Sequence, residues 1–294
     1  MYARAAAALT SVTGSVVVAV LVLPGTAQAA DGTGRQVVIA HRGASAYAPE
    51  NTLEAVDKAD ELGISWVEND VQRTKDGALV VIHDNTLSRT TNVEQVYPDR
   101  APWNVRDFTA AEIAKLDAGS WKGAQFAGAR IPTLHQYLER VDRNHQRLLL
   151  EIKSPELYPG IEDQILRQLG RDGWLRHSRV KHRLIVQSFS ADSVKTVHQR
   201  RPDIKTGFLG TPAVADLPAY AKFADQINPS HTTISAGYVD AVHALKGPHD
   251  KPLEVFTWTV NDTANAVKAI GFGVDGIITN NPDVVRDAVD AMSY

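Results

Sequence analysis

Short runs of apolar and β-branched residues recur along the chain, and each is followed by a segment with helical spacing. The runs predict buried strands, because strands of this kind are four to eight residues long and lie between turn signals. The segments between them carry apolar residues three and four positions apart, which predicts amphipathic helices. The expected strands are residues 37–41, 66–72, 79–83, 148–152, 184–189, 204–209, 224–228, 255–259 and 276–279, and the expected helices are 51–62, 134–141, 161–169, 191–200, 236–245, 263–270 and 282–292.

This alternation of strands and helices is typical of a parallel sheet with helical crossovers. Nine strands in one domain of this length favour a closed barrel over an open sheet. We therefore predict an α/β protein, a (β/α)8 TIM-type barrel, with a single domain over residues 30–294. Residues 84–130 show little strand pattern, and a structureless loop of that length is uncommon in a compact domain. We expect this segment to be a small helical insertion that covers one end of the barrel.

Turn and capping signals refine the expected elements. Residues 74–77 predict a hairpin in which Arg73 pairs with Ala78, and this register would place His83 opposite Glu68. Asn51 stands at a capping-box distance from a glutamate, which predicts that its side chain caps the first helix. Glycines follow the last apolar residue of two helices, as C-terminal capping requires. They are Gly63 and Gly271.

The first 29 residues have the layout of a secretory signal peptide. Arg4 supplies the early positive charge, residues 16–23 form the apolar run, and Ala27 and Ala29 are small residues in front of the expected cleavage site. This apolar run is much shorter than the roughly 20 residues that a membrane-spanning helix needs. We therefore expect cleavage before Ala30 and a secreted, extracellular protein with no stable membrane anchor.

Composition narrows the chemistry that is available to the chain. Lysine and arginine number 31 and acidic residues 34, so the net charge is −3. This balance argues against a nucleic-acid partner, because such proteins replace counterions with an excess of positive charge. The chain has no cysteine, which excludes disulfides, thiolate nucleophiles and metal sites built on thiolates. Catalysis would have to use histidine, carboxylates, hydroxyls, lysine or arginine.

Three carboxylates lie on strands that the pattern predicts to be buried. Glu68 and Asp70 are two residues apart and so point to the same face of one strand, and Glu151 lies on another. Buried carboxylates without partners cost several kcal/mol, on the order of the penalty for any buried unpaired charge. We predict that they share one divalent cation. Oxygen ligands without cysteine favour Ca²⁺ or Mg²⁺ over zinc.

Basic side chains stand at the ends of the first, third and fourth expected strands. His41 and Arg42 end the first strand, His83 ends the third, and Lys153 follows Glu151 by two residues. A structural ion pair, for example between Lys153 and Glu151, would be enough to explain a single strand end of this kind. Four strand ends with this chemistry favour an active site, because the carboxyl ends of barrel strands carry the catalytic groups of barrel enzymes.

Several short motifs follow one another along the chain: HRGA at 41–44, PENT at 49–52, ENDV at 68–71, TKDG at 74–77, HD at 83–84, LEIK at 150–153, SF at 188–189, WTVN at 258–261 and DGIIT at 275–279. Their order resembles that of the glycerophosphodiester phosphodiesterase family. Residues 107–121 also resemble the insertion of that family. Asn69 departs from the family pattern, which usually has an apolar residue between the two acidic positions.

The resemblance implies a barrel phosphodiesterase that binds one divalent cation, Ca²⁺ or Mg²⁺. It implies that one histidine deprotonates the attacking oxygen and the other protonates the departing alcohol. The attacking oxygen is either the glycerol 2-hydroxyl, which would give a cyclic phosphate, or water. The implied roles are metal ligation by Glu68, Asp70 and Glu151, acid–base catalysis by His41 and His83, substrate binding by Arg42, Lys153 and Trp258, and support of these groups by Glu50, Asn51 and Gln187.

We therefore predict a secreted enzyme that hydrolyses glycerophosphodiesters, such as glycerophosphocholine or glycerophosphoethanolamine, to glycerol 3-phosphate and an alcohol. A lysophospholipase D acting on lysophospholipids would use the same chemistry, but it needs an apolar channel lined by the insertion and Trp258. A non-catalytic phosphate-ester binding protein is less favoured, because both histidines are present. A sugar-phosphate isomerase barrel is disfavoured by the export signal.

Overall fold

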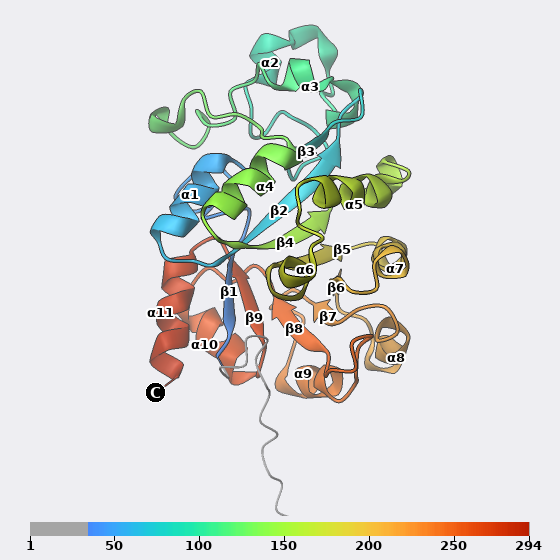
Figure 1. Cartoon of the computed structure of the whole chain (residues 1–294). Coiled ribbons are helices and arrows are strands. Elements are labelled where there is room, and N and C mark those ends of the chain that lie inside the picture. Colours follow the sequence, from blue (N-terminus) through green and yellow to red (C-terminus); the bar gives the residue numbers. More distant parts are fainter. Residues whose placement is uncertain (1–34, 294) are drawn as a thin grey trace, which may run out of the picture.

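The computed structural model describes residues 35–293, and in these residues nine strands form one sheet (Figure 1). The strands are β1 Val37–Ala40, β2 Trp66–Arg73, β3 Leu79–Val81, β4 Arg147–Ile152, β5 Leu184–Ser188, β6 Lys205–Leu209, β7 Gln226–Asn228, β8 Glu254–Thr257 and β9 Gly276–Thr279. Strand β1 pairs in parallel with both β2 and β9, so eight parallel strands close into a barrel. This closure confirms the predicted (β/α)8 architecture. The expected signal peptide, residues 1–29, lies outside the described residues.

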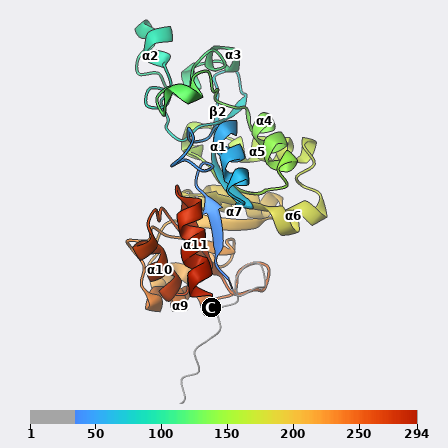
Figure 2. The same ribbon diagram turned by 90° about the vertical axis from the view of Figure 1, so that its left-hand side faces the viewer.

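Helices form a layer around the barrel (Figures 1 and 2). All seven expected helices are present, with ends that differ from the prediction by a few residues at most. Helices α6 and α8 were not predicted, because α6 buries one apolar residue, Val180, and α8 is a single turn. The helices of this layer are α1 Leu53–Glu61, α4 Leu134–Arg143, α5 Ile161–Arg171, α6 His177–Arg183, α7 Ala191–Arg200, α8 Leu217–Tyr220, α9 Ala236–His243, α10 Thr263–Gly271 and α11 Pro282–Met292.

The interior of the barrel is apolar where the strands begin and polar where they end. Side chains two positions apart on a strand point to the same face, so each interior apolar residue predicts the orientation of the residue that follows it by two. The apolar layer contains Val37, Ile39, Trp66, Leu149, Ile185, Phe256 and Ile278. The residues two positions further along include His41, Glu68, Glu151, Gln187, Trp258 and Asn280.

Residues 84–130 form the insertion, which stands beyond the carboxyl end of β2 and beside β3 (Figures 1 and 2). It contains α2 Val93–Val96, α3 Ala110–Ile113 and three short 3-10 turns, and so is less helical than expected. Pro98 begins one of these turns directly after α2, where a proline stops the helix from continuing. The insertion packs on Val80 and Ile82 of the barrel through its own buried cluster, which includes Leu87, Val93, Val105, Phe108, Ile113 and Leu116.

The register of the hairpin formed by β2 and β3 differs from the prediction by one residue. Arg73 pairs with Leu79 rather than with Ala78. The backbone N–H of Thr74 donates to the carbonyl of Ala78 at 2.9 Å, so the loop between the paired residues is one residue longer than expected. Gly77 has a φ of +87°, the left-handed conformation that a three-residue hairpin loop commonly contains. His83 therefore lies two residues beyond β3 and not opposite Glu68.

Two of the predicted helix caps are also wrong. Thr52, not Asn51, caps α1, because its side chain accepts from the backbone N–H of Ala55. At the end of α10 the left-handed residue is Gly273, with a φ of +83°, rather than Gly271, which lies within the helix. Within residues 35–293, no helix has the length and apolar character needed to cross a membrane.

Candidate active site

Three buried carboxylates meet inside the barrel at the carboxyl ends of its strands. Glu68 and Asp70 lie on β2, and Glu151 lies on β4 directly beside Asp70 in the parallel register. One oxygen from each of the three lies within 4.8 Å of the others, and each side chain is almost fully buried. The Oδ1 atom of Asp70 is buried without a hydrogen-bond donor. This oxygen-only cluster has the chemistry of a site for a hard divalent cation.

Burial and mutual repulsion shift the pKa values of these carboxylates in different directions. Burial, and the charges of Asp70 and Glu151, raise the pKa of Glu68 well above its usual value. Burial and the Asp70 charge likewise raise the pKa of Glu151 to about 7. The pKa of Asp70 is lowered despite its burial, because Arg42 and Lys153 lie beside it. A divalent cation would remove the repulsion that raises the first two values.

Arg42 links the carboxylate cluster to the loop that follows β1. The backbone of Arg42 has a φ of +57°, a left-handed conformation that is uncommon for a residue other than glycine. In this conformation its backbone N–H donates to Glu68 at 2.9 Å, while its guanidinium donates to Glu50 at 2.8 Å and lies 3.3 Å from Asp70. Next to it, Gly43 also has a positive φ, and a Cβ atom there would lie 2.6 Å from Ala55.

Asn51 does not cap a helix but holds a carboxylate of the cluster. Its Nδ2 atom donates to Oδ2 of Asp70 at 2.8 Å, and its Oδ1 atom accepts from the Asp70 backbone N–H at 3.3 Å. Asn51 also has a left-handed φ, of +60°. The PENT segment therefore turns tightly so that Glu50 contacts Arg42 and Asn51 contacts Asp70.

Lys153 lies on the other side of the same cluster. Its Nζ atom donates to Glu151 at 2.9 Å and lies 3.8 Å from Asp70. The carboxylates raise the pKa of Lys153 against the opposing effect of burial, so the amine stays charged. Arg42 follows β1 and Lys153 follows β4, so these two cations lie on either side of β2, which carries Glu68 and Asp70.

His41 follows β1 and is oriented by Asn280, which follows β9. The Nδ1 atom of His41 lies 2.7 Å from Oδ1 of Asn280, and the hydroxyl of Ser45 donates to the same oxygen at 2.9 Å. Because an amide oxygen only accepts, Nδ1 of His41 carries the proton and Nε2 keeps a free lone pair. Burial and the nearby charge of Arg42 lower the pKa of His41 to about 4.

His83 is oriented differently, by a carboxylate. Its Nδ1 atom lies 2.6 Å from Oδ1 of Asp84. The backbone around it is held by Gln72 on β2, whose Nε2 atom donates to the carbonyls of Ile82, His83 and Asp84 at 2.8–3.0 Å. Burial lowers the pKa of His83, while the charges of Asp70 and Asp84 act in the opposite direction.

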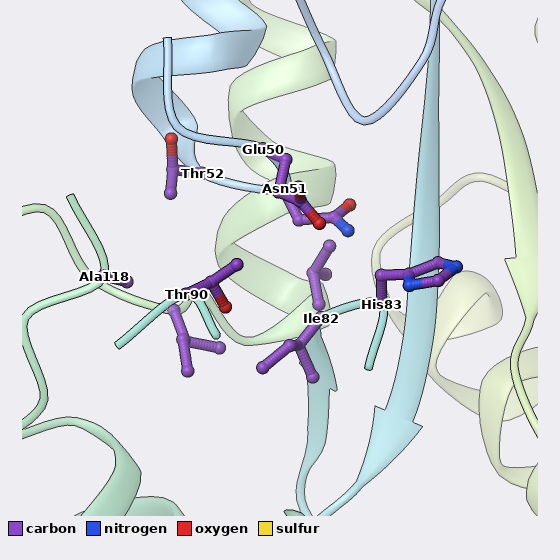
Figure 3. A pocket seen from close by; sticks show the side chains of 9 residues that line it. Glu50, Asn51, Thr52, Ile82, His83, Thr90 and Ala118 are labelled. Carbon is purple, nitrogen blue, oxygen red and sulfur yellow. The ribbon is translucent and has the colours of Figure 1, made fainter. Parts of the chain in front are cut away.

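Figure 3 shows His83 at the edge of a small cavity between the barrel and the insertion. Its volume of about 10 Å³ is close to that of a single water molecule. Glu50, Asn51 and Thr90 also line it, and the ring of His83 points away from it. The insertion therefore packs closely behind His83 and leaves the ring facing the barrel mouth.

Gln187 and Trp258 occupy the far side of the barrel mouth. Gln187 is the neighbour of Glu151 in the register of β4 and β5, and its Oε1 atom accepts from Asn228 at 2.9 Å. Trp258 donates from its indole N–H to the carbonyl of Asn228 at 2.8 Å. Its ring meets the half-exposed ring of Phe189 edge to face, with 5.6 Å between centroids. A cavity of about 250 Å³ lies between Phe189 and Glu151.

Comparison with known proteins identifies the chemistry that this arrangement performs. The glycerophosphoryl diester phosphodiesterase family matches residues 41–284, which is most of the chain. The chain belongs to this family. Its membership confirms the resemblance seen in the motifs from HRGA to DGIIT and makes the chain a phosphodiesterase that acts on glycerophosphodiesters.

Relatives of this phosphodiesterase match over nearly their whole length. The glycerophosphodiester phosphodiesterase of Caldanaerobacter subterraneus subsp. tengcongensis is 38% identical over 87% of this chain and 98% of its own. That of Bacillus subtilis is 34% identical over 85% of both chains. The solved structure of an Oleispira antarctica phosphodiesterase in complex with the product sn-glycerol-3-phosphate is 28% identical, with a TM-score of 0.71 over 87% of this chain and 97% of that one.

The phosphodiesterase barrel brings the predicted site residues to one mouth, and it adds others that sequence reasoning did not identify. Gln72, Asp84 and Asn280 hold the histidines, as described above. Two more come from the insertion. Arg89 contacts both Glu50 and Asp84, and Lys122 donates to the carbonyl of Ser45 at 2.8 Å. The inward orientation of Asn280 could have been inferred from the sequence, because Asn280 follows the interior residue Ile278 by two positions.

Proposed function

We propose that this family member hydrolyses glycerophosphocholine or glycerophosphoethanolamine to glycerol 3-phosphate and an alcohol, with a divalent cation and with His41 and His83 as the acid–base pair. The observation that carries the proposal is that two imidazoles, two basic side chains and three carboxylates from distant segments share one barrel mouth. The relatives are named for glycerophosphodiesters, so a lysophospholipase D activity is not the function we propose.

The cation would be held by Glu68, Asp70 and Glu151, with Ca²⁺ or Mg²⁺ as candidates. When bound, a divalent cation draws negative charge from the phosphoryl oxygens and orients the phosphate as a Lewis acid. Arg42 and Lys153 are positively charged side chains, and both lie beside Asp70. They would hold the non-bridging oxygens of the phosphate.

The partners of the two histidines support different roles for them. The neutral amide of Asn280 and the low pKa of His41 keep its ring uncharged, with the proton on Nδ1 and a free lone pair on Nε2, which suits a general base. Burial lowers the pKa of His83, but the carboxylate of Asp84 accepts from its Nδ1 atom and stabilises the ring when it carries the proton that a general acid donates. In this assignment, His41 removes the proton of the attacking oxygen and His83 protonates the oxygen of the departing alcohol.

Acid–base catalysis alone would be insufficient. A general base and a general acid each contribute about 10²–10⁴-fold, or roughly 3–5 kcal/mol. Enzymes lower their barriers by roughly 8–23 kcal/mol, and anionic phosphodiesters require the upper part of that range. The remainder has to come from the positive charges around the phosphate, which include Arg42 and Lys153.

The attacking oxygen is either the glycerol 2-hydroxyl or water. Attack by the 2-hydroxyl forms a cyclic phosphate, which water then opens. Attack by water gives glycerol 3-phosphate directly. Turnover of a substrate that lacks the 2-hydroxyl distinguishes the two routes, because only direct attack by water can act on it. Phosphorus NMR during the reaction would detect the cyclic phosphate.

The decisive experiment is an assay of the purified protein on glycerophosphocholine, glycerophosphoethanolamine and lysolipids, with chelator and with added Ca²⁺ or Mg²⁺. We expect hydrolysis of the glycerophosphodiesters, loss of activity on chelation and recovery with one of the two cations. His41→Ala and His83→Ala should each lower kcat by about 10²–10⁴-fold. His135→Ala is a matched control, because His135 is exposed and contacts Asp172 far from the mouth. Near-normal turnover in either active-site variant would contradict its assigned role.

Secretion is a separate part of the proposal and has a separate test. The arrangement of residues 1–29 supports export with cleavage before Ala30. N-terminal sequencing of the protein recovered from the culture medium should begin at Ala30. Retention of the protein in the cells with residues 1–29 intact would contradict it.

A further inference from the structure

Arg89, at the start of the insertion, binds two carboxylates at the same time. Its guanidinium donates to both oxygens of Asp84, at 2.6 and 2.9 Å, and to both oxygens of Glu50, at 2.7 and 2.9 Å. This is the paired geometry in which arginine recognises carboxylates most strongly. Arg89 is therefore the link between a residue of the insertion and a residue of the loop after β1.

Each of these carboxylates also holds a group of the active site. Oδ1 of Asp84 accepts from His83, and Oε1 of Glu50 accepts from Arg42. The chain of contacts thus runs from His83 through Asp84, Arg89 and Glu50 to Arg42. In this chain of contacts, only Asp84 separates Arg89 from His83, the proposed acid, and only Glu50 separates it from Arg42, the proposed phosphate ligand.

The charges along this chain explain why Arg89 is needed. Glu50 and Asp84 are both anionic and both bind one guanidinium, so without it they would repel each other. The hydrogen bonds from Arg89 lower the pKa of Asp84, and with the Arg42 charge they lower the pKa of Glu50 against the effect of burial. Both carboxylates therefore stay ionised and acceptor-only toward His83 and Arg42.

We propose that Arg89 is a positioning residue that fixes His83 and Arg42 relative to each other, so that the insertion is part of the catalytic machinery. The inference rests on the roles proposed above for those two residues. The competing explanation is that Arg89 only fastens the insertion to the barrel. The insertion has its own buried core against Val80 and Ile82, which fastens it independently of Arg89.

The stability of the fold should depend little on Arg89. Its side chain is 45% exposed, and ion pairs at exposed positions contribute little to stability. A loss of activity in an Arg89 variant can therefore be separated from unfolding. Arg100 provides the matched control, because it also lies in the insertion and donates to Glu112 and to the Asp107 carbonyl, without contacting the site.

The test compares Arg89→Ala, Arg89→Lys and Arg100→Ala in kcat, KM and melting temperature. We expect Arg89→Ala to lower kcat by about 10–100-fold, the usual effect of losing a group that orients an active-site residue. KM should also rise, because Arg42 loses its orientation. Lysine should restore little, since one ammonium cannot pair with two carboxylates in this way. Arg100→Ala should keep the normal kcat.

Chemical rescue distinguishes a role of Arg89 in orienting His83 and Arg42 from a role in attaching the insertion to the barrel. Free guanidinium at a non-denaturing concentration should restore part of the kcat of Arg89→Ala, because the vacated position is accessible to solvent. It should restore nothing in His83→Ala. A normal kcat in Arg89→Ala, or a loss matched by Arg100→Ala, would overturn the inference. If instead His83→Ala were fully active, the proposed function would fail, whatever the Arg89 variants show.

Discussion

The Nδ1 atom of His41 lies 2.7 Å from the Oδ1 atom of Asn280, a residue 239 positions further along the chain. The contact joins the first strand of the barrel to the last at the point where the sheet closes. Since the amide oxygen only accepts, it sets the tautomer of the proposed general base. A neutral partner is also suited to a base, because a carboxylate in its place would favour the protonated ring.

Asn280 variants should change the pH dependence of the reaction in a defined direction. Asn280→Asp places a negative charge beside His41 and should raise its pKa from about 4. The acidic limb of the kcat/KM profile should then move to higher pH, because the base is lost earlier as the pH falls. Asn280→Ala should lower kcat by about 10–100-fold through loss of orientation. An unchanged acidic limb in Asn280→Asp would exclude His41 as the group that titrates there.

Glu151→Gln should alter how stability depends on pH in the metal-free protein. The pKa of Glu151 is raised from 4.5 to about 7, so between these values the folded state binds more protons than the unfolded state. This group therefore lowers the stability as the pH rises from 4.5 to 7, by up to about 3 kcal/mol. The difference in unfolding free energy between Glu151→Gln and the parent should grow in favour of the variant over that range.

Adding Ca²⁺ or Mg²⁺ provides the control for this measurement. A cation held by three carboxylates should stabilise the parent at neutral pH and should stabilise Glu151→Gln much less. Denaturant titrations at several pH values, with and without cation, would show both effects. A constant difference between the two proteins across the pH range would contradict the raised pKa of Glu151.

Asn69→Leu should stabilise the protein. Asn69 is fully buried on β2, and neither its Oδ1 nor its Nδ2 atom has a hydrogen-bond partner. Buried polar groups without partners cost about 1–3 kcal/mol each, and leucine has the same branched shape, with two apolar methyl groups in place of the amide atoms. We expect a gain of about 1–3 kcal/mol in unfolding free energy with unchanged kcat, measured by denaturant unfolding. Asn51→Leu, at the buried asparagine that holds Asp70, should instead lose activity.

Phe189→Leu should weaken binding of a quaternary ammonium head group selectively. Phe189 is half exposed, and with Trp258 it forms an aromatic pair beside the cavity at Glu151. A cation on such a face gains about 0.5–1 kcal/mol, so KM for glycerophosphocholine should rise about 2–5-fold. KM for a glycerophosphodiester with an uncharged alcohol should change less. Val267→Ala, at an exposed apolar residue of α10, should change neither. Equal effects on both substrates would assign the ring another role.

The sequence allowed the barrel and the centre of the site to be predicted, because both follow from short-range rules. The spacing of Glu68 and Asp70 places them on one face of a strand, and the next parallel strand brings Glu151 alongside. The polar ends of several strands then meet at one edge by the geometry of a parallel barrel. These inferences need no knowledge of how loops are folded.

The groups that orient the site could not be predicted in the same way. Arg89 lies in a segment without periodicity, and its contacts depend on how the insertion docks. The spacing of Asn51 predicted a helix cap, and only the family resemblance implied that it supports the site, because its contact with Asp70 depends on a left-handed backbone that local spacing does not reveal. The predicted hairpin register was wrong by one residue, because the loop takes in one more residue, with Gly77 in a left-handed conformation.

Closure of the barrel by β9 makes activity depend on the strand that completes the ring. A chain truncated before Gly276 leaves an edge of β1 unpaired and has no amide to hold His41. The carboxylates and cations of the site belong to other strands, but the proposed base would lack the partner that orients it. Such a truncated product should be inert toward phosphodiesters.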